Sequence, residues 1–169
     1  RVQPSGAGVT LLPPGFDAVA ERLVRAGLRA RVEPDIARAR LAKLLVNVAI
    51  NPLAAIHRVP NGALLEPPYR AALDELVREA WPVLRAEGLA LDLDSALARV
   101  HAVAAATAAN RASMLQDVLA GRRTEIDAIT GALLRKAEAG GFEVPAHRAV
   151  RALVRRIEHA AFDSPEGRG

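Results

Sequence analysis

Residues 41–56, LAKLLVNVAINPLAAI, constrain the fold most, because this stretch is apolar except at Lys43, Asn47 and Asn51. Each of these residues follows the previous one by four positions. Four residues on an α-helix advance a side chain by only about 40°, so the ammonium and the two amides share one stripe roughly 12 Å long. A helix that is apolar on its other sides is typically buried, where polar groups need partners. The sequence therefore predicts a buried central helix whose polar stripe is either bonded to neighbouring backbone or functional.

The distribution of basic residues favours a functional stripe. The chain has 23 Lys and Arg residues, and only Lys43 and Lys136 are lysine. Arginine does not give up its proton in proteins, whereas a partly buried lysine can be tuned to do so. We therefore expect Lys43 to sit at a buried position and to transfer a proton, with the amides of the same stripe holding a substrate.

Composition narrows the class of protein. With 169 residues the chain can form one domain with a real core, or one domain plus part of another. The absence of Cys excludes disulfides and thiolate chemistry and fits a soluble cytoplasmic protein, and the four His residues lack metal-ligand spacing, so no metal site is expected. The net charge of +4 comes from scattered Arg, with only 3% aromatic residues, which indicates solvated helix faces rather than nucleic-acid binding.

Two further features concern the extent of the chain and membranes. No signal peptide and no charge-free apolar run of about 18 residues is present, so no membrane span is expected. The chain begins with Arg and its single methionine is Met114, so we expect a fragment of a longer protein.

The first 34 residues differ in character from the rest. Residues 9–12 form a short apolar run, Asp17 can cap a helix that ends at Gly27, and residues 28–32 alternate as a half-exposed strand does. Strand, helix and strand in this order predict that residues 1–34 are the remnant of an α/β domain. Residues 35–161 are then predicted to form a helical domain, and residues 162–169 a loose tail.

About six helices are predicted from Asp35 onward. Asp35 caps the central helix, which is expected to end or kink after Asn51 because Pro52 cannot donate to the carbonyl of Val48. Asn61-Gly62 predicts a turn, in which Asn61 either tolerates a left-handed backbone or serves a site.

Two capping boxes are predicted further along the chain. The pattern SMLQ makes Ser113 the N-cap of one helix. The pattern TEID makes Thr124 the N-cap of another, with Glu125 in its first turn, where the helix dipole favours a carboxylate. The remaining helices are expected over residues 71–86, over residues 96–109 and from about Pro145.

Several short motifs occur in a fixed order along most of the chain: KLLVN and INPL in the central helix, NG at residues 61–62, SMLQD at 113–117, and TEID with a later Gly131. Each is weak alone. In this order and spacing, residues 36–159 resemble the C-terminal domain of the ketopantoate reductase family, also called 2-dehydropantoate 2-reductase. The resemblance implies an all-helical domain like that of 6-phosphogluconate dehydrogenase, preceded by an α/β NADP-binding domain of which residues 1–34 would be the end.

The resemblance also implies an activity, namely NADPH-dependent reduction of ketopantoate to pantoate in pantothenate and coenzyme A biosynthesis. It assigns the proton donor to Lys43, and a catalytic and cofactor-facing role to Glu125. The substrate-binding residues that it implies are Asn47, Asn51, Asn61, Asn110 and Ser113. NADPH would be bound mainly by a domain preceding Arg1, so the chain alone would be inactive, and a homodimer through the helical domain is possible.

Elementary chemistry agrees with these roles, because hydride addition builds negative charge on the carbonyl oxygen. A positioned ammonium can stabilise that charge and then protonate the oxygen.

Two positions depart from the family pattern and leave alternatives open. Leu41 stands where the family usually has Trp, and His147 where it usually has Asn. The alternatives are a related reductase of another 2-oxo acid, or a helical interaction module without activity of its own. Neither a nucleic acid nor a membrane is an expected partner.

Overall fold

The computed structural model describes the backbone of residues 8–162 and the side chains of residues 8–160. The chain divides into two compact units, residues 1–42 and residues 43–169. Apart from the backbone of residue 162, the predicted tail at 162–169 lies outside the described residues.

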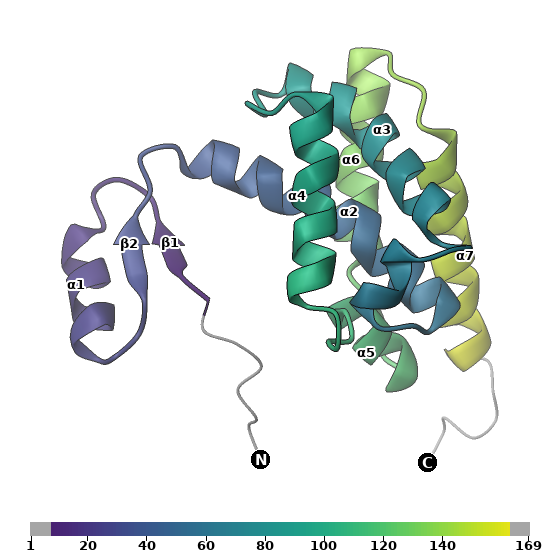
Figure 1. Cartoon of the computed structure of the whole chain (residues 1–169), viewed down its shortest axis with the longest axis horizontal. Coiled ribbons are helices and arrows are strands. Elements are labelled where there is room, and N and C mark those ends of the chain that lie inside the picture. Colours follow the sequence, from purple (N-terminus) through teal and green to yellow (C-terminus); the bar gives the residue numbers. More distant parts are fainter. Residues whose placement is uncertain (1–7, 163–169) are drawn as a thin grey trace. The chain divides into compact units, whose positions relative to one another are not determined.

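The first unit is a single strand-helix-strand motif (Figure 1). Strands β1 (Thr10–Leu12) and β2 (Ala30–Val32) are parallel neighbours, and α1 (Asp17–Arg25) connects them. The predicted order of strand, helix and strand is confirmed, and parallel pairing through a helix is the βαβ unit of α/β domains. The predicted cap at Asp17 is wrong. Phe16 takes the cap position and Asp17 is the first helical residue, where a carboxylate still favours the helix dipole.

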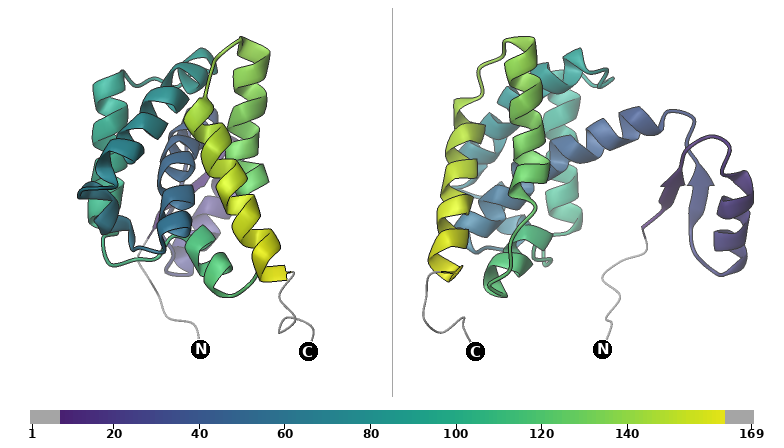
Figure 2. Two further views of the ribbon diagram at one scale, coloured as in Figure 1. Left: turned by 90° about the vertical axis from the view of Figure 1, so that its right-hand side faces the viewer. Right: turned by 180° about the vertical axis from the view of Figure 1, so that it is seen from behind.

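The second unit is helical. Its elements are α2 (Ile36–His57), which begins in the first unit, the 3₁₀-helix η1 (Asn61–Leu65), α3 (Arg70–Ala86), α4 (Leu93–Ala106), α5 (Ser113–Leu119), α6 (Ile126–Gly140) and α7 (Pro145–Phe162). Six α-helices between residues 35 and 162, where the description of the backbone ends, confirm the prediction of a helical domain. Figure 2 shows α2 passing between the pair α3 and α4 and the pair α6 and α7.

Helix α2 is the core element of this unit, but only over its second half. Leu45 and residues 48–55 are buried, whereas the residues before Leu45 are exposed or half-buried. This helix is long and apolar enough to cross a membrane. However, 56% of its 18-residue apolar stretch is buried inside the protein, as in the core helix of a globular domain.

The expected end of this helix at Asn51 is wrong, because α2 continues through Pro52 to His57. A proline removes one backbone donor, a loss that packing can offset. Residues Leu53, Ala54 and Ala55 are buried, and their packing favours continuation of the helix.

The start of α7 is attached to α3 by one carboxylate. Glu79 accepts hydrogen bonds from the backbone N–H groups of Ala146 (2.8 Å) and His147 (3.1 Å), and its Oε2 lies 3.0 Å from His147 Nδ1. Because a carboxylate only accepts, Nδ1 carries the proton of this bond. The imidazole is fully buried, and its Nε2 has no hydrogen-bond partner among the described residues.

This arrangement predicts a pH-dependent stability. Burial lowers the pKa of His147 below its ordinary value of 6.5, and the hydrogen bond and charge of Glu79 only partly oppose this effect. As the pH falls, the unfolded chain therefore binds the proton before the folded chain does. The stabilising contribution of the neutral imidazole is at its full value above about pH 6.5, and the free energy of unfolding decreases as the pH falls below it. Urea titrations across this range should show the decrease. The variant His147→Asn should show a smaller slope, and an unchanged slope would contradict the assignment.

Candidate functional site

The polar stripe of α2 runs from solvent into the core. Lys43 is exposed, Asn47 is half-buried and Asn51 is 7% exposed. The expectation of a buried lysine is therefore wrong, because α2 enters the core only from Leu45 onward. The stripe thus places an accessible ammonium at its outer end and an amide at its inner end.

The ammonium of Lys43 is free within the part of the chain that the structure describes, where no hydrogen bond or ion pair reaches it. The other lysine, Lys136, forms an ion pair with Glu87. Of the two lysines, Lys43 is therefore the one available for chemistry.

Asn61 and Asn110 are brought together by the backbone. The N–H of Asn61 donates to the carbonyl of Asn110 (3.0 Å), and the N–H of Gly62 donates to that of Ala108 (3.1 Å). Asn61 is 8% exposed, whereas Asn110 is exposed. The left-handed reading of Asn61 is wrong, since the described non-glycine residue with positive φ is Arg58.

A relay of hydrogen bonds fixes the amide of Asn61. The hydroxyl of Thr107 donates to the carbonyl of Val103 (2.7 Å), so its oxygen is left to accept from Asn61 Nδ2 (2.9 Å). Asn61 Oδ1 is then the atom without a partner among the described residues. Sequence reasoning missed Thr107, because no local motif marks a partner 46 residues away.

Gly62 is required by the close approach of two backbones. A Cβ at this position would lie 2.6 Å from the Cβ and 2.9 Å from the Cα of Ala108. Gly62→Ala must therefore separate η1 from the end of α4, and we expect a loss of about 1–3 kcal/mol in the free energy of unfolding. Gly8→Ala is the matched control, because a Cβ there meets nothing within 4 Å. Equal midpoints in urea for both variants would contradict the prediction.

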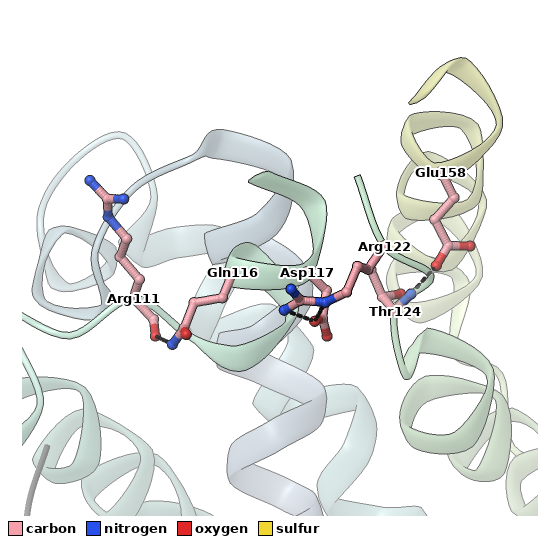
Figure 3. Close-up of polar contacts among 6 residues, drawn as sticks. All are labelled: Arg111, Gln116, Asp117, Arg122, Thr124 and Glu158. Carbon is pink, nitrogen blue, oxygen red and sulfur yellow. Dashed lines mark hydrogen bonds and ion pairs between the residues drawn. The ribbon is translucent and has the colours of Figure 1, made fainter. Parts of the chain in front are cut away.

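Ser113 is placed differently from the capping-box prediction, which is wrong. Ala112 takes the cap position of α5, and Ser113 is the first helical residue and is exposed. The side chain of Gln116 turns back and donates to the carbonyl of Arg111 (2.9 Å), as Figure 3 shows. The hydroxyl of Ser113 is therefore not used in capping.

Glu125 is the N-cap residue of α6 rather than a residue of its first turn, as was predicted, and its carboxylate does not cap the helix. The predicted N-cap at Thr124 is also wrong, because Thr124 lies one residue before the cap position; its hydroxyl accepts the N–H of Ile126 (3.2 Å). At the starts of α2 and α4, by contrast, the carboxylates of Asp35 and Asp92 each accept a hydrogen bond from a backbone N–H group. The exposed carboxylate of Glu125 has no hydrogen-bond or ion-pair partner within residues 8–160.

The predicted site residues thus form three separate groups rather than one hydrogen-bonded network. One group lies on α2 and contains Lys43, Asn47 and Asn51. The second is the hydrogen-bonded pair Asn61 and Asn110, and the third lies at the starts of α5 and α6 and contains Ser113 and Glu125. No hydrogen bond or ion pair joins these three groups in the described part of the chain. A hollow of about 590 Å³ on α4, lined by residues such as Leu91, Arg99 and Ala102, includes none of them.

These features define a helical domain that is built on a core helix carrying one lysine and two asparagines, and that follows a βαβ unit in the sequence. The chain belongs to the ketopantoate reductase family. The family model described as "Ketopantoate reductase PanE/ApbA C terminal" matches residues 35–158.

Two curated relatives illustrate the match. The 2-dehydropantoate 2-reductase of Vibrio cholerae is 40% identical over 127 residues, which are 75% of this chain and 43% of the relative. That of Pyrobaculum aerophilum is 37% identical over 159 residues, which are 94% of this chain and 57% of the relative. The chain therefore spans about half the length of the curated relatives it matches.

Solved structures agree with the fold. A PanE/ApbA family ketopantoate reductase from Ralstonia eutropha JMP134 has a TM-score of 0.83 at 34% identity, covering 93% of this chain and 53% of that one. D-mandelate dehydrogenase, solved with NADH and anilino(oxo)acetate, has a TM-score of 0.84 at 26% identity, covering 93% of this chain and 69% of that one.

Proposed function

We propose that this chain supplies the substrate side of an NADPH-dependent reductase that converts 2-dehydropantoate to pantoate, a step of pantothenate and coenzyme A biosynthesis. The observation that carries the proposal is the polar stripe of α2, which ends on the free ammonium of Lys43. Family membership and the names of the curated relatives support the reaction.

In this proposal NADPH, when bound, supplies the hydride, and Lys43 donates the proton. Its ammonium faces the carbonyl oxygen of the substrate, stabilises the negative charge that develops there and then donates its proton. Because no residue in the described part of the chain pairs with it, no such ion pair has to break first.

The asparagines and Ser113 hold the substrate. Amides can donate and accept at once, which suits a molecule bearing a hydroxyl, a carbonyl and a carboxylate. Asn47 and Asn51 follow Lys43 along the stripe. Asn61 with Asn110, and the exposed hydroxyl of Ser113 facing the carboxylate, complete the set.

Glu125 is the residue of this chain that we assign to the cofactor. Its carboxylate accepts from no donor within residues 8–160, so it can accept the carboxamide N–H group at the nicotinamide end of NADPH. The phosphates and adenine would be held by a nucleotide-binding half outside these residues. A cytoplasmic location and a homodimer through the helical unit belong to the same proposal.

The test uses the two-domain form, in which this chain follows a nucleotide-binding half like that of its relatives. Oxidation of NADPH is followed by absorbance with 2-dehydropantoate, with 3-methyl-2-oxobutanoate, which lacks the hydroxymethyl group, and with phenylglyoxylate. We expect turnover with 2-dehydropantoate and higher kcat/KM than with the other two acids. No turnover with any acid would overturn the proposal.

A second candidate is a reductase of another 2-oxo acid, favoured by the similarity to D-mandelate dehydrogenase. A higher kcat/KM with phenylglyoxylate than with 2-dehydropantoate would select this candidate.

A further inference from the structure

The segment that carries Glu125 is held by a residue of another helix. Glu158, near the end of α7, accepts the backbone N–H of Thr124 through Oε1 at 2.6 Å, as Figure 3 shows. The two residues are 34 positions apart. Hydrogen bonds to a carboxylate are shorter and about twice as strong as those between neutral groups. The short bond from Thr124 to Glu158 is therefore a strong one.

Hydrogen bonds hold the backbone at Glu125 and at the residues on either side of it. Besides the bond to Glu158, the hydroxyl of Thr124 accepts the N–H of Ile126, and the carbonyl of Glu125 accepts the N–H of Ile129 (2.9 Å). The carboxylate of Glu125 takes part in none of these bonds. The result is a fixed backbone from which one free carboxylate projects.

The loop that precedes this segment is also closed. Arg122 donates to Oδ1 of Asp117 through Nε (3.1 Å) and through its terminal nitrogen (2.8 Å), while its own N–H donates to the carbonyl of Asp117 (2.8 Å). The loop between α5 and α6 is therefore tied back to Asp117 of α5, and Glu158 anchors it to α7 (Figure 3).

Docking of α7 against the start of α6 does not depend on Glu158 alone. Asp127, in the first turn of α6, pairs with Arg151 Nε at 2.7 Å and lies 3.9 Å from Arg155 Nε. The buried residue Val154 adds apolar packing on α7. These contacts keep the helices together, so the particular contribution of Glu158 is to the residue immediately before Glu125.

We propose that Glu158 is a positioning residue, which fixes the place of the Glu125 carboxylate by accepting the N–H of Thr124. The inference rests on the proposed reductase function, in which the Glu125 carboxylate accepts the carboxamide N–H at the nicotinamide end of the cofactor and Glu158 has no contact with substrate or cofactor. Small displacements of a positioned group can cost a large part of its catalytic effect, so the contact is expected to matter for kcat.

The test compares Glu158→Ala with Glu158→Gln in the two-domain form, where the wild-type protein is assayed first. Glu158→Ala removes the acceptor, and we expect kcat with 2-dehydropantoate to fall about tenfold. Glu158→Gln keeps a carbonyl oxygen at the same place and should restore at least half of the lost kcat. His159→Ala, at an exposed neighbouring position on α7, is the matched control and should leave kcat unchanged.

A double-mutant cycle separates positioning from a general structural role. If Glu158 acts through Glu125, Glu158→Ala should have little further effect on kcat in a Glu125→Gln background. Multiplying effects, or a fall in kcat explained by the unfolded fraction at the assay temperature, would overturn the inference. Amide hydrogen exchange at Thr124 should be protected in the wild type and accelerated in Glu158→Ala. Absence of turnover in the wild type would instead refute the proposed function, independently of this contact.

Discussion

Replacing Lys43 with alanine is expected to lower kcat for 2-dehydropantoate reduction by about 10²- to 10⁴-fold, the usual contribution of a general acid. The variant loses both the charge that stabilises the developing oxyanion and the proton that completes the alcohol. The midpoint of thermal unfolding should hardly change, because Lys43 is exposed and no described residue pairs with its ammonium. The measurement is steady-state turnover in the two-domain form, with a thermal melt of the same preparation.

Lys136→Ala is the matched control for this variant. Lys136 is the other lysine of the chain, and its pairing with Glu87 makes it a surface ion pair rather than a reactive group. We expect its removal to leave kcat within about twofold and to cost at most about 1 kcal/mol of stability. A Lys43→Ala protein that melts much earlier, with turnover explained by its folded fraction, would refute the catalytic role.

Lys43→Arg separates charge from proton transfer. Arginine keeps a positive charge near the oxygen but does not release a proton in proteins. We expect its kcat to lie between that of the wild type and that of Lys43→Ala. An arginine variant with full activity would show that charge alone suffices.

The local elements of the fold could be predicted because their signals are local. The apolar periodicity of the helices and the glycines after α1 and α6 appear within a few residues of the elements they delimit. Gly27 and Gly141 have φ values of 81° and 70°, a backbone conformation that glycine adopts without strain. The βαβ order of the first unit and the six helices that follow were therefore expected.

What could not be predicted depends on partners distant in sequence. Burial of the stripe was inferred from the apolar residues around it, but Lys43 is exposed because α2 enters the core only from Leu45 onward. The N-cap of α5 is Ala112 rather than Ser113, because the helix begins one residue earlier than the motif predicts. The partners Thr107 and Glu158 are 46 and 34 residues from the groups they hold, a separation that no capping pattern reports.

Glu79 is the residue for which the same reasoning predicts the largest structural effect. It lies 68 positions before His147, yet its carboxylate satisfies two backbone donors at the start of α7 and the buried imidazole. Glu79→Ala would leave a fully buried Nδ1–H and an uncapped helix start. The expected loss in the free energy of unfolding is about 3 kcal/mol, since each lost charge-assisted bond and each buried orphan donor costs on the order of 1–3 kcal/mol.

Chemical denaturation of Glu79→Ala, with Glu75→Ala as the matched control, measures this loss. Glu75 lies one turn earlier on α3 and is exposed, so its removal should change stability by less than about 0.5 kcal/mol. Glu79→Gln should fall between the two, because one amide oxygen can still accept while the amide nitrogen cannot. If Glu79→Ala were as stable as Glu75→Ala, the start of α7 would not depend on this carboxylate. A large loss confined to Glu79→Ala would show that one side chain of α3 holds the helix from which Glu158 reaches the proposed site.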